Sequence, residues 1–469
     1  MGSAAASAPP QLPTNPVRRI AGELLLERRA AGRLPPGDVA LSVRRTKAMI
    51  RDPLHLLLDA YERHGPVFSL RVLHARNVFV LGPQANHQVL VSEADAFRWR
   101  DGAFSELIPL LGDGLLTTDG ERHRRDRRIM LPAFHRERIA AAAGVMREET
   151  ERALAPWRDG MRVEIYHWAR ELALRVALRA LFGIDPDATR RPGEDPARDF
   201  ERALAFYGYD YWLQVLRGPR TPWAAMQAAR RRLDRLIAGE IVRRRASGER
   251  GEDVLSLLLD ARDEQTGELL DDVAVRDETM TLLFAGHDTT TATVSFLLYE
   301  LAGHPEIDAR LAAEPALLDQ VLDETLRLYP PAWIGPRRAA RDVEIAGTWI
   351  AAGLPVNYSS WVSHRLPDVW EEPDAFRPER FTPEARARLP KGAYVPFGAG
   401  SRICIGMRFG QLEIKVIAAA LLERFRVERV AGHRLDVRHT PTLGPHGGLP
   451  LIVRQRTVSD STTSKPGPA

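Results

Sequence analysis

Cys404 is the only cysteine of the 469-residue chain, and it lies in the run Phe397-Gly-Ala-Gly-Ser-Arg-Ile-Cys-Ile-Gly406. A single thiol cannot form an internal disulfide, and it cannot supply a zinc or iron–sulfur site that needs several cysteines. Three roles are left open. The thiol could be an inert part of the core, a nucleophile, or the one thiolate ligand of a metal that brings its other ligands with it.

The residues around Cys404 favour the ligand role. Apolar residues repeat at helical spacing over 407–425, so the cysteine would precede a helix N-terminus, where free amides favour an anion. Arg402 is a permanent cation suited to a carboxylate, and Phe397 can shield the sulfur from water. Glycine tolerates left-handed backbone angles and lets the chain approach a flat ligand closely; it occupies positions 398, 400 and 406.

A second unusual run, Leu282-Leu-Phe-Ala-Gly-His-Asp-Thr-Thr-Thr-Ala292, interrupts an apolar helical pattern that extends over 271–301. Asp271 and Asp272 are placed to cap the start of this helix. Glycine, aspartate and threonine are poor helix formers, and buried acids and hydroxyls are costly unless they are satisfied. The run is either a kink without chemistry or a polar site built into a buried helix.

Both runs resemble motifs of the cytochrome P-450 family. The first matches its haem-ligand loop, Phe-x-x-Gly-x-Arg-x-Cys-x-Gly, and the second its oxygen-binding motif, Ala-Gly-x-Asp-Thr-Thr. The resemblance implies haem b held by the Cys404 thiolate, with Phe397 and Gly406 beside it. It also implies that Thr289 hydrogen-bonds dioxygen at the iron and that Asp288 relays protons to it. No His, Asn or Asp arrangement stands out as the partner that a cysteine hydrolase would need.

The resemblance extends to a predicted ion network. Glu324 and Arg327 share a helix face at i, i+3, which alone indicates no more than an exposed ion pair. The spacing matches the family's Glu-x-x-Arg motif, and Arg380 in Phe376-Arg-Pro-Glu-Arg-Phe381 supplies the third member. By resemblance these residues form a buried structural network that fixes the segment before the haem loop.

Haem carries two propionates, and the resemblance assigns cations to them. His123 and Arg127 lie at i, i+4 on one predicted helix face. Arg338 and Arg402 match the next two positions. The register between Arg337 and Arg338 is open, and the spacing to Asp342 favours Arg338.

The substrate side is predicted from the resemblance and from aromatic content. Residues 206–212, Phe-Tyr-Gly-Tyr-Asp-Tyr-Trp, concentrate aromatic rings in a chain whose aromatic content is only 7%. Core packing explains such a cluster equally well, but in the family this region covers the active site. An apolar cavity would suit a terpenoid, a fatty acid or a steroid. The predicted wall residues are Phe104, Leu107, Tyr207, Leu282, Ala285, Trp333 and Ile334.

These residues require a helix-rich framework with small sheets. Strand patterns occur at 65–72 and 77–82 and return near 343–346 and 449–453, whereas helical patterns dominate from about 120 to 330. We expect an α+β, predominantly helical fold organised as one large domain over 17–456. The tails, 1–16 and 457–469, have the composition of disordered segments.

Composition excludes several functional classes. The net charge of +4 is small and spread along the chain, so nucleic-acid binding is not indicated. No long apolar run or signal peptide is present, and we expect a cytoplasmic, monomeric protein without a membrane anchor. The length leaves no room for a reductase domain, so a ferredoxin or flavodoxin with its reductase would deliver electrons. Arginines of 120–130, with Arg408 and Lys415, could form its basic docking surface.

We therefore expect a haem-thiolate monooxygenase that hydroxylates or epoxidises a hydrophobic small molecule with dioxygen. A peroxygenase is one alternative, but that class usually replaces the acid–alcohol pair that Asp288 and Thr289 provide. A haem sensor or carrier is another, and it would need neither Thr289 nor the aromatic cluster.

Overall fold

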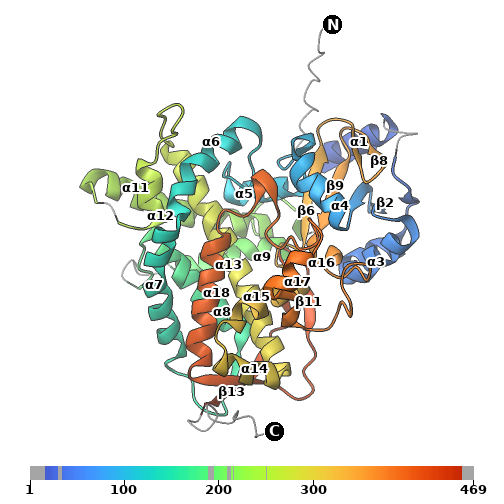
Figure 1. Ribbon diagram of the computed structural model, residues 1–469. Coiled ribbons are helices and arrows are strands. Elements are labelled where there is room, and N and C mark those ends of the chain that lie inside the picture. The colour runs from blue at the N-terminus through green and yellow to red at the C-terminus, as the bar shows by residue number, and fades with distance from the viewer. Residues whose placement is uncertain are drawn as a thin grey trace, which may run out of the picture.

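The computed structural model describes residues 16–29, 34–187, 195–208, 213–214, 216–249 and 251–456. They form a large helical body with a smaller β-rich lobe on one side, drawn in blue and orange at the right of Figure 1. The predicted α+β, mainly helical class is confirmed. The predicted disordered tails lie outside the described residues except for Pro16, which begins α1.

The β-rich lobe is built on a six-stranded sheet of order β1-β2-β3-β9-β6-β4. The predicted strand pair is confirmed, since β2 and β3 run antiparallel with Val67 opposite Val80 and Val72 opposite Ala75. Smaller sheets have the orders β10-β13-β5, β11-β12 and β7-β8. The strands are β1 Gly37–Asp38, β2 Val67–Val72, β3 Ala75–Val80, β4 Phe97–Arg98, β5 Arg162–Glu164, β6 Ile334–Ala339, β7 Val343–Ile345, β8 Thr348–Ile350, β9 Pro355–Ser359, β10 Phe425–Arg429, β11 Asp436–Arg438, β12 Gly444–His446 and β13 Pro450–Gln455.

Helices make up most of the remaining chain. The α-helices are α1 Pro16–Arg29, α2 Val43–Arg51, α3 Pro53–His64, α4 Pro83–His87, α5 Ile108–Leu111, α6 Gly120–Met130, α7 Arg136–Leu154, α8 Ile165–Val176, α9 Pro196–Ala205, α11 Pro222–Ser247, α12 Val254–Asp260, α13 Asp272–Gly303, α14 Pro305–Ala313, α15 Leu317–Leu328, α16 Ser360–Ser363, α17 Pro383–Arg388 and α18 Met407–Leu422. Short 3-10 or π turns are η1 Gln88–Ser92, η2 Ala94–Ala96, η3 Ala103–Leu107, η4 Leu131–Phe134, η5 Ala177–Leu181, η6 Phe206–Gly208, η7 Pro378–Phe381 and η8 Gly400–Arg402.

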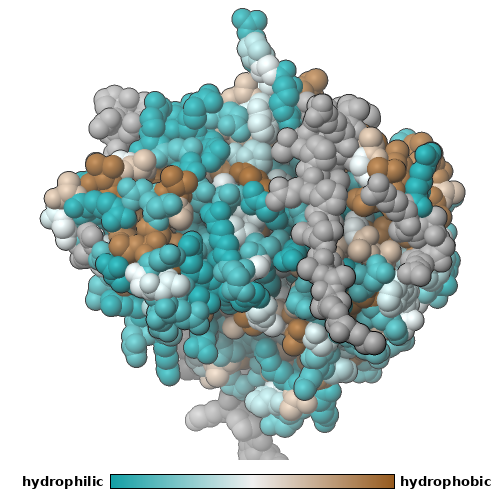
Figure 2. Space-filling view, turned by 90° about the horizontal axis from the view of Figure 1, so that it is seen from above, coloured by the Kyte–Doolittle hydropathy of each residue, from teal (hydrophilic) through white to brown (hydrophobic). Residues whose placement is uncertain are grey.

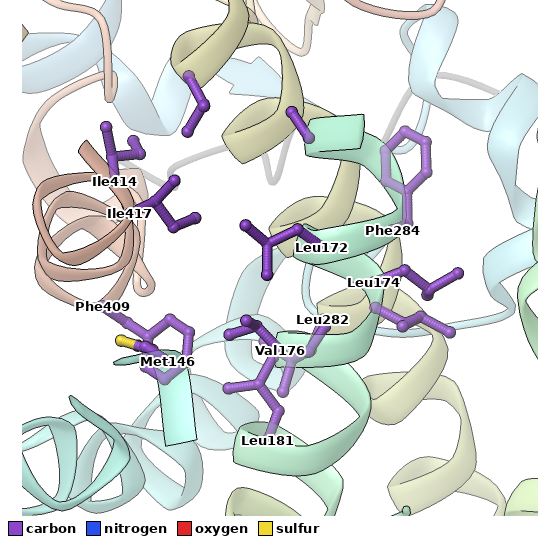
Figure 3. Close-up of a cluster of buried hydrophobic side chains, with 14 of the residues drawn as sticks. Met146, Leu172, Leu174, Val176, Leu181, Leu282, Phe284, Phe409, Ile414 and Ile417 are labelled. Atoms are coloured by element: carbon purple, nitrogen blue, oxygen red, sulfur yellow. The ribbon is translucent and has the colours of Figure 1, made fainter. Parts of the chain in front are cut away.

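Helix α13 is the central element of the helical body. Its start is capped as predicted, because the carboxylate of Asp271 accepts the backbone N–H of Ala274 at 2.7 Å. Apolar side chains of α13 pack with those of α7, α8 and α18, and Figure 3 shows Leu282, Leu172 and Phe409 among them. This packing buries the helix on nearly all sides, so any accessible residue along it is informative.

None of the helices in the described part of the chain is both long and apolar enough to cross a bilayer.

Candidate active site

The Cys404 loop has the conformation that a thiolate ligand requires. Cys404 lies three residues before the first residue of α18, and its backbone N–H donates to the carbonyl of Phe397 at 2.9 Å. Burial raises the pKa of the thiol, while the backbone N–H of Gly406 and the guanidinium of Arg127 oppose that shift. The side chain nevertheless has an exposed surface. A group that is surrounded by protein and still accessible lines an internal space.

Two of the loop glycines are required by the backbone, and the third is not. Gly398 and Gly400 have φ of 68° and 65°, and a Cβ at Gly400 would collide with the carbonyl of Leu90. Gly406 has φ −85°, and a Cβ there would meet no protein atom within 4 Å. Glycine at 406 thus leaves clearance beside the sulfur, as a flat ligand lying over the loop would need.

The second accessible surface lies on α13. Ala285 is exposed and Thr289 is partly exposed, although Phe284, His287 and Asp288 around them are buried. Positions i and i+4 share a helix face, so Ala285 and Thr289 border one internal space. The Thr289 hydroxyl donates to the carbonyl of Ala285 at 2.6 Å. Cys404 lies just before α18, and α13 packs on α18. The accessible faces of Thr289 and Cys404 therefore lie on neighbouring parts of the structure.

Asp288 lies on another side of the same helix. Its carboxylate contacts Arg170 at 3.1 Å and Arg438 at 3.4 Å, and it accepts a hydrogen bond from the hydroxyl of Thr442. Burial alone would raise the pKa of Asp288, but the guanidinium groups of Arg438 and Arg170 outweigh it and hold the pKa below its usual value. The acid is therefore an ionised, fully engaged group. Arg170 also pairs with Glu201 on α9, which links Asp288 towards the surface.

Buried cations gather beside the Cys404 loop. Arg402 donates to the Thr118 carbonyl at 2.8 Å and to Asp119 at 2.6 Å, and burial lowers its pKa to about 10. His123 and Arg127 both lie on α6, as predicted. Burial lowers the pKa of His123 to about 3, and the nearby positive charges of Arg402 and Arg127 add to this shift.

The prediction for Arg338 needs a correction. Its guanidinium donates to the carbonyls of Asp101 at 2.8 Å and Gly353 at 2.6 Å and lies 3.3 Å from Glu23 of α1. Successive side chains of a strand point to opposite faces, so the preceding residue of β6, Arg337, points the other way. The guanidinium carbon of Arg337 lies 3.5 Å from the Trp99 ring centroid, and its charge lowers the pKa of Arg402. Arg337, not Arg338, belongs to the cationic group.

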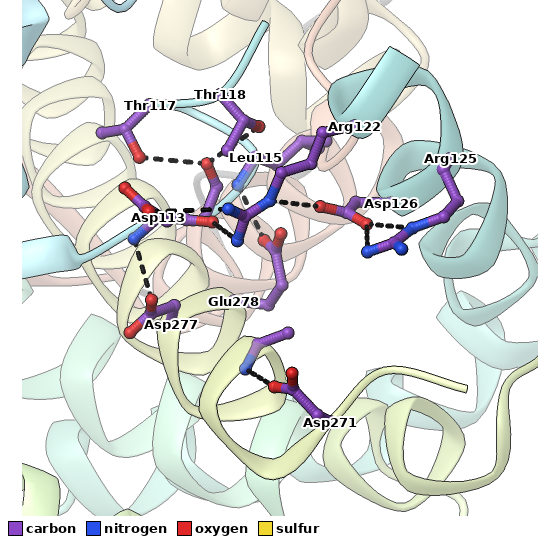
Figure 4. A network of polar contacts seen from close by, with 12 residues as sticks. Asp113, Leu115, Thr117, Thr118, Arg122, Arg125, Asp126, Asp271, Asp277 and Glu278 are labelled. Carbon is purple, nitrogen blue, oxygen red and sulfur yellow. Dashed lines mark hydrogen bonds and ion pairs between the residues drawn. The ribbon is translucent and has the colours of Figure 1, made fainter. Parts of the chain in front are cut away.

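A polar network holds the loop that carries the partners of Arg402 (Figure 4). On α13, Asp277 accepts the backbone N–H of Asp113 at 2.8 Å, and Glu278 accepts that of Leu115 at 3.0 Å. Burial raises the pKa of Glu278 to about 8. Neither these two acids nor Asp119 were among the residues predicted for the site. Carboxyl groups within an apolar helical pattern could have pointed to Asp277 and Glu278. Their hydrogen-bond partners, however, lie more than 100 residues away in sequence.

The structure brings the predicted ion network together. Glu324 lies 2.7 Å from Arg327 and 3.3 Å from Arg380. Arg327 also donates to the carbonyl of His364 at 2.9 Å, and the neutral His364 ring bonds both the carbonyl of Arg327 and the N–H of Val395, the latter at 2.9 Å. Val395 lies two residues before Phe397. The network therefore fixes the chain that enters the Cys404 loop, and His364, which sequence reasoning missed, is the connecting residue.

The predicted wall residues fall into different environments. Ala285 is exposed to the internal space, whereas Leu107 and Leu282 are buried and Ile334 is partly buried. Tyr207 is buried, and its hydroxyl donates to the carbonyl of Glu106 at 3.1 Å, which joins η6 to η3. The side chain of Phe104 in η3 and the aromatic residues at 209, 211 and 212 lie outside the described set.

Trp333 differs from its predicted role. Its indole N–H donates to the carbonyl of His439 at 2.6 Å, and its ring packs edge-on to Trp361 at 5.9 Å between centroids. Both rings belong to a buried apolar cluster with Phe68 and Phe79. These are the contacts of a core residue, and the preceding Pro330-Pro331 break gave no information on which face of the chain would turn inward.

The residues present fit a haem group. Cys404 provides an accessible sulfur at a helix start, Gly406 leaves clearance beside it, and Ala285 opens the facing helix. Arg127, Arg337, Arg402 and His123 form a basic group in which burial disfavours the charge of each member. Two carboxylates of a ligand would relieve that cost, and haem propionates are such carboxylates.

Comparisons with known proteins agree with this arrangement. The family model described as Cytochrome P450 matches residues 35–445. The chain is 33% identical over 447 residues to cyclooctat-9-en-7-ol 5-monooxygenase of Streptomyces melanosporofaciens, covering 90% of this chain and 95% of that protein. It is 29% identical over 401 residues to pentalenene oxygenase of Streptomyces avermitilis, covering 81% and 88%.

A solved structure described as retinoic acid bound cyanobacterial CYP120A1 superposes with a TM-score of 0.79 at 28% identity, covering 90% of this chain and 99% of that one. The match of the family model over most of the chain, together with relatives above 30% identity, establishes membership. The chain belongs to the cytochrome P-450 family, and it is a haem-dependent monooxygenase.

Proposed function

We propose that this monooxygenase oxidises a terpenoid, using electrons from a separate redox protein. Two of the similar proteins, cyclooctat-9-en-7-ol 5-monooxygenase and pentalenene oxygenase, have names that specify hydrocarbon-rich substrates of this kind. Leu282 and Phe284, which lie close to Ala285 on α13, belong to the main apolar cluster, and this supports a substrate without charge. This favours a terpenoid over the fatty acid and steroid classes, because a fatty acid would also need a partner for its carboxylate.

The observation that carries the proposal is the accessible face of Ala285 and Thr289 within a buried helix. Haem bound through Cys404 supplies the iron at which dioxygen is activated. Ala285 leaves room on its face of α13 for the substrate, and the neighbouring apolar residues Leu282 and Phe284 would help to exclude water. The Thr289 hydroxyl, at rest on the Ala285 carbonyl, can rotate to donate its proton to an oxygen atom in the space that it borders.

Asp288 is suited to replenish that proton only indirectly. Its carboxylate must first exchange an arginine partner, since Arg170, Arg438 and Thr442 occupy it. Arg170 shares its guanidinium with Glu201 on α9, so movement of α9 would change how tightly Asp288 is held. We propose that the Glu201–Arg170–Asp288 chain connects solvent to the Thr289 side of the helix.

We propose an external ferredoxin or flavodoxin as electron donor. Most cations that could form its docking surface are already neutralised, since Arg125 pairs with Asp126 at 2.8 Å, Arg128 with Asp263 at 2.9 Å and Lys415 with Asp319 at 2.8 Å. Arg408, one residue into α18, is exposed and makes no ion pair with the described residues. A docking site would therefore centre on Arg408. The predicted monomeric state and cytoplasmic location stay predictions.

The proposal is tested by Thr289→Ala with Thr289→Ser as its matched control. Removing the hydroxyl should lower product formed per electron pair by on the order of 10²-fold while reductant is still consumed, because general acid assistance has this magnitude. Serine keeps the hydroxyl, so Thr289→Ser should retain most of the coupling between reductant consumption and product formation. Product carrying oxygen from labelled dioxygen is the readout, and undiminished coupling in Thr289→Ala would reject the role.

Substrate class is tested by titrating the holoenzyme with terpenoid, fatty-acid and steroid panels and recording the haem absorption shift. A terpenoid should displace the water on the iron at the lowest concentration. A shift produced by fatty acids alone would contradict the substrate class and leave the reaction type intact.

A further inference from the structure

An apolar and basic surface lies on the β-rich lobe, away from the active site. Helix α2 has no buried residue, and Leu41, Val43 and Ile50 are 79%, 74% and 67% exposed. Figure 2 shows apolar residues gathered at the right-hand edge of the molecule, the side on which Figure 1 places α3 and β2. Single exposed aliphatic residues need no explanation, but a group at this exposure does.

Leu73 extends this surface from the neighbouring hairpin. It lies in the two-residue turn between β2 and β3, and its backbone N–H donates to the hydroxyl of Thr46 on α2 at 3.1 Å. Leu73 has φ of 53°, a left-handed conformation that favours glycine or asparagine. The side chain is also 43% exposed. A leucine here is thus unfavourable for both the turn and the surface.

Cations surround these aliphatic residues. In a helix of 3.6 residues per turn, Lys47 lies between Val43 and Ile50 on the outer face, and Arg51 and Arg44 border that face. All three are exposed, and none forms an ion pair with any residue in the described ranges. The nearest acid in sequence, Asp52, is engaged by the ring of His55 at 2.8 Å. The surface therefore carries three cations without an ion-pair partner among the described residues.

A second apolar group of Figure 2, on the side of α11, provides a contrast. Val242 on α11 is 64% exposed, but the cations next to it in sequence are paired with acids. Arg243 pairs with Glu240 at 2.7 Å and Arg245 with Asp272 at 2.7 Å. The surface of α2 and the hairpin differs from this group, because its exposed aliphatic residues lie beside cations that form no ion pair with the described residues.

We propose that the surface formed by Leu41, Val43, Ile50, Leu73, Arg44, Lys47 and Arg51 binds an anionic lipid bilayer peripherally. Aliphatic side chains flanked by lysine and arginine are the composition of an interfacial helix, in which the apolar groups enter the acyl boundary and the cations meet lipid phosphates. Protein interfaces are instead enriched in aromatic residues, which this surface lacks. A protein partner would also need a surface complementary in shape to the helix and the hairpin turn, whereas a fluid bilayer would not.

The test is co-sedimentation of the full-length holoenzyme with vesicles of phosphatidylcholine, with or without phosphatidylglycerol. The protein should bind only the anionic vesicles, and added salt should weaken binding. Replacing Lys47 or Arg51 by Gln should lower the partition coefficient by about fivefold each.

Leu73→Asn separates membrane binding from folding. Asparagine suits the left-handed turn, so the thermal midpoint should not fall, while the partition coefficient should drop by about tenfold. Val242→Ser is the matched control and should leave binding unchanged. The proposal is overturned if wild-type protein ignores anionic vesicles, or if Leu73→Asn binds them equally well. Concentration-dependent dimerisation abolished by Ile50→Ser, without vesicle binding, would assign the surface to a second copy of the chain instead.

Discussion

At the scale of single residues, the protein alone does little to stabilise the thiolate form of Cys404. Burial raises the pKa of the thiol, and only the Gly406 N–H and the Arg127 guanidinium oppose this. A thiol in this environment stays protonated at neutral pH unless a metal ion binds it. The loop therefore positions a sulfur for iron more than it activates a nucleophile, which agrees with the absence of a predicted hydrolase partner.

The two adjacent arginines of β6 give a prediction at the same scale. Arg337→Gln should weaken haem binding by about tenfold or more, because it removes a charged donor from the propionate side. Arg338→Gln should leave haem affinity unchanged and lower the free energy of unfolding, since its bonds to Asp101, Gly353 and Glu23 hold the lobe together. The rate of haem transfer to an acceptor protein measures the first effect, and denaturant unfolding the second. Equal haem loss from both variants would refute the assigned register.

At the scale of elements, α13 and α18 meet through a buried polar contact that sequence reasoning did not find. The hydroxyl of Thr290 donates to Glu413 Oε2 at 3.3 Å, while Oε1 of the same side chain has no hydrogen-bond partner in the described part of the chain. Burial raises the pKa of Glu413 to about 8. The acid is therefore protonated at neutral pH, directly behind the Thr289 site.

This contact predicts a pH dependence of stability. Because the folded-state pKa of Glu413 lies above its unfolded value, the folded protein keeps a proton that the unfolded chain releases. The contribution of protonated Glu413 to the free energy of unfolding is complete below about pH 4.5. It is lost as the pH rises towards 8, by roughly 1.4 kcal/mol per pH unit at most.

Glu413→Gln mimics the protonated acid and removes the dependence. Its free energy of unfolding relative to wild type should rise between pH 5 and 8 and be flat above that range. Denaturant titrations at several pH values measure the difference. A difference that does not change with pH would show that Glu413 titrates normally in the folded protein.

At the scale of the whole molecule, the features that depend on interactions between residues close in sequence could be predicted from sequence patterns. The β2–β3 pair and the capped helix α13 follow from side-chain periodicity and from Asp271, and the predicted helix-rich class is observed. The Cys404 loop and the Ala285–Thr290 run were recognisable because their residue types are unusual for a turn or a buried helix.

Long-range partners could not be predicted in the same way. Asp119 and His364 contact the site across gaps of 283 and 31 residues, and nothing near them in sequence marks the partner. The choice between Arg337 and Arg338 depended on which face of β6 turns towards the site. Both faces of that strand are buried, so its sequence shows no alternation of apolar and polar residues that would distinguish them. Trp333 failed for a related reason, since an aromatic residue suits the core and a cavity wall equally.

The central claim is that the sulfur of Cys404 ligates haem iron as an anion, and the spectrum of the reduced protein with carbon monoxide tests it most directly. Purified wild-type protein should contain one haem per chain and give a thiolate-type carbonyl spectrum, and Cys404→His should retain the fold and give an imidazole-type spectrum. A folded wild-type protein without stoichiometric haem, or with an imidazole-type spectrum, would contradict the account.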